Sequence, residues 1–143
     1  MHSALKSRSM KTARRALFGL ALALAALPAL ADWKEIYRFD DGMRIFVNQT
    51  RPFRDGDFAE ITHLVRWGEP QTDDNDAVYL STLVRTRYDC QHKLERYLGS
   101  TSYAGQMANG DVVISDDNEA DKWYTISEAS MEEKLWNVAC RRP

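Results

Sequence analysis

The sequence predicts an α+β protein in which one helix covers a face of an antiparallel sheet. Three observations support this prediction. Apolar and polar side chains alternate with a period of two through most of residues 33–126, as they do in half-buried strands. After Ser130 the spacing changes to that of an amphipathic helix. The two cysteines, Cys90 and Cys140, lie one in each part, so a bridge between them would join the helix to the sheet.

The first half of the sheet is predicted from alternation and turn signals. Strands are expected at residues 33–40, 43–47 and 58–67. Gly42 follows two aspartates and supplies the positive φ of a hairpin turn between the first two strands. Residues 49–57 are interpreted as a loop, and the polar residues 68–77 as a connection.

Residues 79–90 form the clearest strand of the chain. Its apolar face carries Leu80, Thr82, Val84, Thr86, Tyr88 and Cys90, and its other face carries Ser81, Arg85, Arg87 and Asp89, interrupted by Leu83. The pattern of residues 92–104 fits a strand or a helix, and its Tyr, Thr and Ser residues favour a strand. Short strands are expected at residues 111–115, after an Asn-Gly turn signal, and at residues 123–126.

The C-terminal helix is predicted from its cap and its spacing. Residues 130–133 fit a capping box, in which the Ser130 hydroxyl accepts a hydrogen bond from the backbone N–H three residues on and a glutamate reaches back. The apolar stripe repeats through Met131, Leu135 and Val138, with Trp136 and Ala139 beside it. Arg141 and Arg142 follow the last turn, where cations suit the helix dipole.

Residues 1–31 have the organisation of a secretory signal peptide, with a basic start, a short apolar run and an Ala-Leu-Ala cleavage site. The apolar run is shorter than the roughly 20 residues that span a membrane. We expect cleavage after Ala31, which leaves residues 32–143 as a single exported domain without a membrane anchor or a cysteine near its start to carry a lipid. Met10 heads a compact signal by itself, so translation starts at Met1 or at Met10.

Charge and cysteine content narrow the class of partner. Five of the 19 Lys and Arg residues and none of the 21 Asp and Glu residues lie in residues 1–31, so residues 32–143 carry a net charge of −7. An acidic domain of this kind repels nucleic acids and anionic membranes. Export places Cys90 and Cys140 in an oxidising compartment, and no C-x-x-C motif activates a thiolate, so a structural disulfide is expected.

Several residues recur in an order that is familiar from one family. Trp33 opens the exported part, Tyr88-Asp89-Cys90 ends the central strand, and Trp123 precedes Ser130, Leu135 and Cys140. In this set, spread over residues 33–140, the chain resembles the surface-adhesin protein E-like family of small exported Gram-negative proteins. The resemblance implies a curved sheet of about six antiparallel strands, with the C-terminal helix tethered to its concave face by the disulfide.

The chain departs from that family in two places. Relatives often carry Pro-Gly just before the residue that caps the helix, and Glu128-Ala129 stands there instead, which predicts a less rigid loop. The adhesin that names the family is anchored by a lipid, for which this chain offers no cysteine.

No catalytic constellation is found, and we expect no enzymatic activity. The motifs of nucleophilic hydrolases, phosphate-binding loops and zinc proteases are absent from the sequence. His63 lies in an alternating strand and reads as a sheet residue, whereas His92 would share a face with Cys90 if that strand continued. The acidic runs 73–76 and 116–119 lack the spacing of a calcium loop and read as solvated turns, so no metal or cofactor is expected.

The candidate partner-binding residues are Arg66, Arg85 and Arg87, which share the sheet face turned away from the helix. The simpler interpretation is that these arginines lie on a solvated face, where Glu60 and Asp89 balance their positive charge. We therefore expect a non-catalytic module that contacts a host-matrix or envelope protein, in the periplasm or at the cell surface. The alternatives are a homodimer, and a small-ligand carrier with haem bound by His63 or His92.

Overall fold

The computed structural model describes residues 32–141 of the chain, so the expected signal peptide and Arg142 lie outside the described residues. The described strands are β1 (Trp33–Arg38), β2 (Arg44–Asn48), β3 (Phe53–Asp55), β4 (Phe58–Thr72), β5 (Val78–Asp89), β6 (Leu94–Tyr103), β7 (Val112–Asp116) and β8 (Tyr124–Thr125), followed by helix α1 (Met131–Cys140). All paired strands are antiparallel, in the order β1-β2-β4-β5-β6-β7. The short strands β3 and β8 pair with β4 and β6. The predicted α+β class is confirmed.

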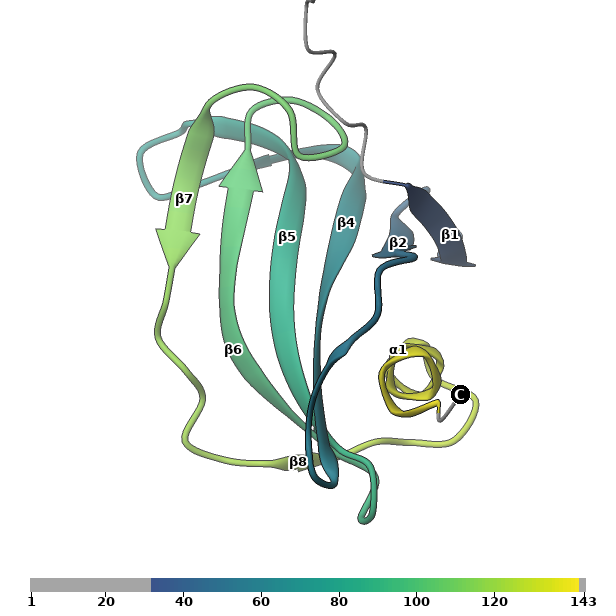
Figure 1. The fold of residues 1–143 in the computed structure, drawn as a ribbon. Helices are drawn as coiled ribbons and strands as arrows, with labels where there is room; N and C mark the ends of the chain where they lie inside the picture. The colour runs from purple at the N-terminus through teal and green to yellow at the C-terminus, as the bar shows by residue number, and fades with distance from the viewer. Residues whose placement is uncertain (1–31, 142–143) are drawn as a thin grey trace, which may run out of the picture.

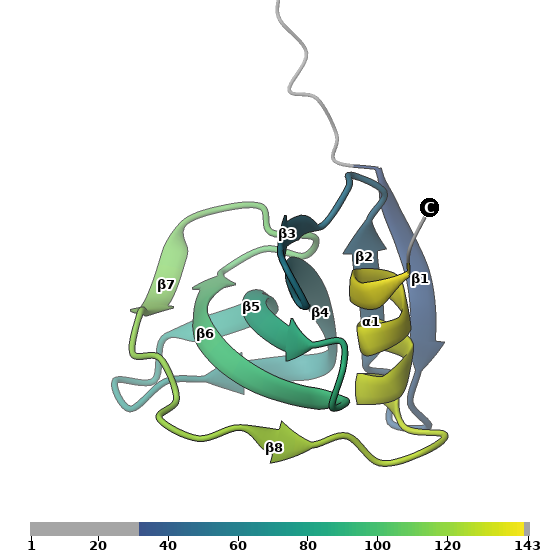
Figure 2. The same cartoon turned by 60° about the horizontal axis from the view of Figure 1, so that its bottom comes forward.

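The sheet is strongly curved, and α1 lies on its concave side, in contact with β1, β4 and β5 (Figures 1 and 2). Irregularities in the register accompany this curvature, since an extra residue on one strand bends and twists it. One lies between Arg85 and Thr86 of β5, and another between Arg66 and Gln71 of β4.

The hydrophobic core lies between the concave face and the helix. Its buried members are Ile45, Val47, Ala59, Val65, Tyr88, Ile126, Leu135 and Ala139. The predicted faces of β4 and β5 agree with the register, because Ala59 pairs with Tyr88 and Val65 with Thr82. The two buried helix residues, Leu135 and Ala139, are four positions apart and project from one side of α1.

Two sequence predictions are corrected by the sheet. Residues 49–57 contain the three-residue strand β3, which pairs with the start of β4 instead of remaining a loop. Strand β4 continues beyond Trp67 to Thr72, so only residues 73–77 connect it to β5. The predicted strand at residues 92–104 is confirmed as β6.

The capping box forms as predicted. The Ser130 hydroxyl accepts a hydrogen bond from the Glu133 backbone N–H at 3.1 Å, and a carboxylate oxygen of Glu133 accepts one from the Ala129 N–H at 2.7 Å. Ala129 lies at φ +57°, in the left-handed region that favours glycine. The bend before the helix therefore carries a conformational cost.

The disulfide joins Cys90, directly after β5, to Cys140, the last residue of α1, with the two Cα atoms 5.4 Å apart. A second connection reinforces it, since the Arg54 guanidinium of β3 donates to the Arg141 carbonyl oxygen at 2.6 Å. The helix is therefore held at its C-terminal end by β3 and by the end of the central strand.

Candidate functional site

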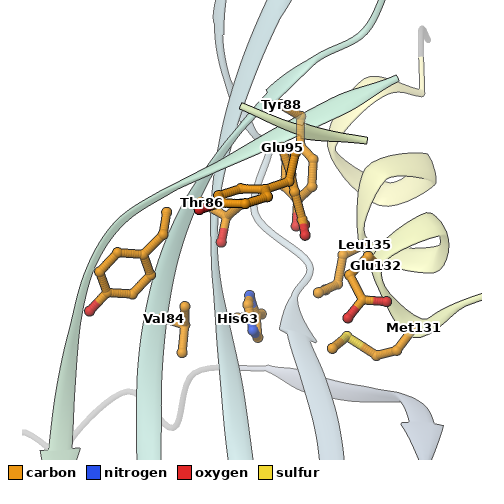
Figure 3. Close-up of a pocket in the computed structure, with 10 residues that line it drawn as sticks. His63, Val84, Thr86, Tyr88, Glu95, Met131, Glu132 and Leu135 are labelled. Atoms are coloured by element: carbon orange, nitrogen blue, oxygen red, sulfur yellow. The ribbon is translucent and has the colours of Figure 1, made fainter. Parts of the chain in front are cut away.

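A cavity of about 210 Å³ lies between the helix and the concave face (Figure 3). It is lined by His63, Val84, Thr86, Tyr88, Glu95, Tyr97, Tyr124, Met131, Glu132 and Leu135. Its volume is below the roughly 300–1,000 Å³ of sites for drug-sized ligands. The cavity therefore suits a small group, and a macrocycle as large as haem does not fit inside it.

The register of the sheet explains why these side chains meet. On the concave face, Tyr88 pairs with Glu95 across β5 and β6, and Glu95 pairs with Tyr124 of β8. His63 pairs with Val84 in the same way. Directly opposed residues of antiparallel strands project to the same side, so all of these side chains face the helix.

Two buried polar atoms of this cavity have no hydrogen-bond partner among the described residues. They are Nδ1 of His63 and the hydroxyl of Tyr88, whose residues are 6% and 0% exposed. Burial lowers the pKa of His63 to about 4 and raises the pKa of Tyr88. Both side chains are therefore neutral at pH 7, and both keep hydrogen-bonding capacity that a ligand could use.

Two carboxylates face the cavity from opposite sides. Glu95 projects from β6, and Figure 3 shows Glu132 pointing from the helix into the space beside His63. Among the described residues neither carboxylate has a hydrogen-bond or ion-pair partner. Burial, and secondarily the negative charge of Glu132, raise the pKa of Glu95. The cavity therefore concentrates negative charge without a cation to balance it.

This arrangement offers binding groups and no activated nucleophile. Both cysteines are in the disulfide, and no partner lowers the pKa of the Tyr88 hydroxyl enough to ionise it. Within residues 32–141, no group of three or more His, Cys, Asp or Glu side chains is placed to hold a metal ion. The cavity can accept hydrogen-bond donors and positive charge.

The convex face carries Arg85 and Arg87, as the alternation predicted, and both are engaged in ion pairs. Arg85 pairs with Asp117 at 3.0 Å. Arg87 pairs with Asp55 at 3.1 Å and with Glu60 at 3.3 Å. The side chain of Arg85 is 51% exposed and that of Arg87 is 25% exposed, so Arg85 is the more accessible of the two.

Arg87 also belongs to a row of stacked cations and rings. Its guanidinium lies 4.9 Å from the centroid of the Phe58 ring, and the Phe58 and Trp123 rings lie 5.6 Å apart. Arg96 completes the row 5.3 Å from the Trp123 ring and pairs with Glu119. Stacked cations and rings of this kind stabilise a surface and hold its side chains in place.

Arg66 lies apart from the other two arginines. It pairs in register with Ser81 of β5, four residues before Arg85, and with Arg44 of β2. All three candidate arginines share one face, but they are spread along it and do not converge on one point.

The structure separates the two histidines. His63 lines the cavity, whereas the His92 side chain is 64% exposed in the turn after β5, with its ring 2.9 Å from the Asp89 carboxylate. The strand does not continue through Cys90, so His92 does not share a strand face with it.

The acidic run 73–76 forms a turn, whereas the run 116–119 begins at the end of β7 and continues as an irregular segment. Asp73 accepts hydrogen bonds from the Asn75 and Ala77 backbone N–H groups, and Asp116 accepts one from the Asn118 N–H. These bonds lower the pKa of both carboxyls.

Sequence reasoning did not single out Glu95 or Glu132. The alternation of β6 contains a signal, because Glu95 and Tyr97 fall on one side of the strand. The convergence of Glu95 with Glu132 depends on where the helix packs, and periodicity does not report that.

Comparisons with known proteins agree with this fold. The family model described as surface-adhesin protein E matches residues 33–141. Crystal structures of protein E from Haemophilus influenzae are similar to this chain. One, from a non-typeable strain, has a TM-score of 0.57 at 7% identity, with 74% of each chain covered. Crystal form II has a TM-score of 0.59 at 8% identity, with 74% of this chain and 86% of the other covered.

A search of curated protein sequences finds no match. Within the described part of the chain, no helix is both long and apolar enough to cross a membrane. At identities this low, the structural likeness establishes the fold alone. The family match spans three quarters of the chain, from the first strand to the end of the helix, and on that ground the chain belongs to the surface-adhesin protein E family.

Proposed function

We propose that this chain is an exported, adhesin-like binding module that contacts a protein partner and catalyses no reaction. The observation that carries the proposal is membership of a family named for a surface adhesin. The absence of an activated nucleophile from the cavity is consistent with it. The partner is a host-matrix protein if the chain faces outward, and an envelope protein if it stays in the periplasm.

We propose the convex face, with Arg66, Arg85 and Arg87, as the partner-binding surface. The helix lies on the opposite face (Figure 1), and the side chain of Arg85 is half-exposed on this one. Arg85 is half-exposed, and its single ion pair with Asp117 is weak enough to exchange for an acidic group of a partner. Arg87 is held by two carboxylates and a ring, and its role is to keep the surface rigid.

A protease applied to intact cells distinguishes the two locations. If the chain faces outward, it is cleaved while a known periplasmic protein in the same cells survives. Protection until the outer membrane is opened would place it in the periplasm and remove the host-matrix partner.

Capture experiments test the surface. Immobilised protein is incubated with host-matrix proteins or envelope extract, and Arg85→Gln and Arg66→Gln are compared with Arg51→Gln, an exposed arginine outside the proposed surface. We expect the first two variants to lose capture and the third to retain it. Equal capture by all three variants would exclude the arginine surface, and no specific capture by the parent protein would contradict the function itself.

The cavity favours a second candidate function, the carriage of a small ligand. Its two unpartnered buried polar atoms support this candidate. Haem is disfavoured as the ligand, because the cavity is small and His92 lies outside it. Titration with haem tests this directly, since no shift of the Soret band is expected.

Self-association remains a further proposal. Strand β7 is an outer strand of the sheet, and its Val112 is 56% exposed. An unpaired outer strand can pair with a second copy of the chain. Light scattering at high concentration tests this, and a monomeric mass would exclude it.

A further inference from the structure

We propose that the cavity between α1 and the concave sheet face is a binding site for a primary alkylammonium group. Two sources share this chemistry: a lysine side chain of a protein partner, and a free alkylamine. The inference concerns a different surface from the arginine face and stands without it, because a small amine can bind whether or not a partner protein is captured.

The first argument for an ammonium ligand is the negative charge of the cavity. Glu95 and Glu132 are both half-buried and line the same small space. By contrast, Asp55, Glu60, Asp117, Glu119 and Glu133 each pair with an arginine or lysine. Two partly desolvated carboxylates in one cavity are stabilised by a cation that enters between them.

The second argument is that two buried polar atoms of the cavity lack a hydrogen-bond partner among the described residues. The Tyr88 hydroxyl is completely buried and can accept a hydrogen bond, and so can Nδ1 of His63 when the proton is on the other ring nitrogen. An ammonium group has three N–H donors and needs acceptors on several sides. The carboxylates of Glu95 and Glu132, together with these two atoms, offer acceptors from three strands and the helix.

The walls suit the carbon chain of such a ligand. Tyr97 and Tyr124 present rings, and Met131, Val84 and Leu135 present aliphatic and thioether groups. Aromatic faces attract ammonium groups, and the apolar side chains accept the methylenes behind them. A cavity of about 210 Å³ has room for a short alkyl chain behind the ammonium group.

Other ligand classes fit less well. An anion is repelled by the two carboxylates. A metal ion lacks the required set, since no cluster of three ligating side chains forms within residues 32–141. A neutral alcohol would leave the carboxylate charges unbalanced.

The test is an NMR titration of the exported chain, residues 32–143, with n-butylammonium chloride. We expect saturable shifts at Glu95, Tyr97 and Glu132, and none with 1-butanol, which has the same chain length without the charge. Glu95→Gln and Glu132→Gln should each weaken binding about tenfold or more, as expected for the loss of a charge-assisted hydrogen bond. Glu69→Gln makes the same chemical change at an exposed site outside the cavity and should bind like the parent protein.

The Glu95 variant also reports on its own folding. Because burial and Glu132 raise the pKa of Glu95, its ionised form destabilises the folded chain at pH 7, and Glu95→Gln should raise the thermal midpoint. The gain should fade as the pH falls below about 4, where the parent carboxyl is protonated in both states. A variant that is more stable and binds no amine cannot be dismissed as misfolded.

Two further probes distinguish the sources. N-acetyl-lysine-N-methylamide presents a lysine side chain with its backbone blocked, and 1,4-diaminobutane is a free diamine. Binding of the capped lysine supports a partner's side chain, and binding of the diamine alone supports a free amine. Equal shifts with butylammonium and 1-butanol, unchanged affinity in both cavity variants, or no saturable shift with any amine would overturn the proposal.

Discussion

The indole N–H of Trp136 donates a hydrogen bond to the backbone carbonyl oxygen of Asp89, 3.0 Å away, beside the disulfide that joins the same two elements. The helix is thus held to the end of β5 by a covalent bond and by a hydrogen bond one turn earlier. The two connections differ in what each contributes to stability, and this difference can be measured.

Replacing both cysteines, as Cys90→Ala with Cys140→Ala, should lower the free energy of unfolding by up to about 4 kcal/mol, because the bridge closes a loop of 50 residues in the unfolded chain. The Trp136 bond and the core contacts of Leu135 should keep the helix packed. Urea unfolding measures the loss, and retained near-ultraviolet circular dichroism would show intact packing. A variant with no near-ultraviolet signal would show that the disulfide alone positions the helix.

Ala129→Gly should stabilise the protein by about 1 kcal/mol, since Ala129 adopts a left-handed conformation that costs an L-residue roughly 1–2 kcal/mol. Ala77→Gly is the matched control at an exposed loop residue of ordinary φ, and it should be neutral or slightly destabilising. Thermal unfolding of the two variants checks this. If Ala129→Gly is no more stable than Ala77→Gly, the left-handed backbone at residue 129 does not destabilise the protein.

Gly68→Ala should destabilise the protein by about 1–3 kcal/mol. A Cβ atom at Gly68 would lie 2.2 Å from the carbonyl oxygen of Asp41, where the β1–β2 turn crosses β4. Gly56→Ala separates steric overlap from backbone strain, because Gly56 lies at φ +58° with no atom within 4 Å of the added carbon. Urea unfolding should rank Gly68→Ala as the more damaging change, and the reverse order would contradict the overlap.

His63 should make the protein sensitive to mild acid. Burial lowers its pKa from 6.5 to about 4, so the unfolded chain binds a proton in a range where the folded chain does not. The contribution of His63 to the free energy of unfolding is at its full value above pH 6.5. It falls as the pH drops towards 4, by about 2 kcal/mol between pH 7 and pH 5. Glu95 and Glu132, together with the tyrosines Tyr88, Tyr97 and Tyr124, face the same cavity.

Comparison with His63→Phe isolates the histidine from those groups. Urea unfolding at pH 7 and pH 5 gives the loss for each protein, and the variant should lose about 2 kcal/mol less than the parent. Equal losses in the two proteins would place the acid sensitivity elsewhere.

The sequence predicted the long, regular elements because their periodicity repeats many times. The face shared by Thr86 and Tyr88 was correct because a two-residue period assigns sides unambiguously. Strand β3 was missed because three residues are too few to establish a period. The extension of β4 was hidden by Gly68 and Pro70, which usually mark turns. Here they lie in the irregular stretch between Arg66 and Gln71, where the pairing with β5 is interrupted.

The candidate site was predicted in part. The arginines of the convex face follow from alternation, whereas their carboxylate partners do not. Asp117 pairs with Arg85 across 32 residues, and its position depends on the path of the chain after β7. Glu95 and Glu132 meet only because the helix packs over β4 and β5 at one particular position. Contacts between separate elements are set by three-dimensional packing, which no local pattern encodes.

The disulfide makes residues 90–140 a closed covalent ring that contains β6, β7, β8 and α1. Exposed residues such as Asp117 and Lys122 lie between β7 and β8, within this ring. A protease that cuts there opens the ring without releasing a fragment, so a nicked chain keeps its full mass on a non-reducing gel. Cleavage within this ring therefore becomes visible only after reduction, and a band that looks intact before reduction is not proof of protection.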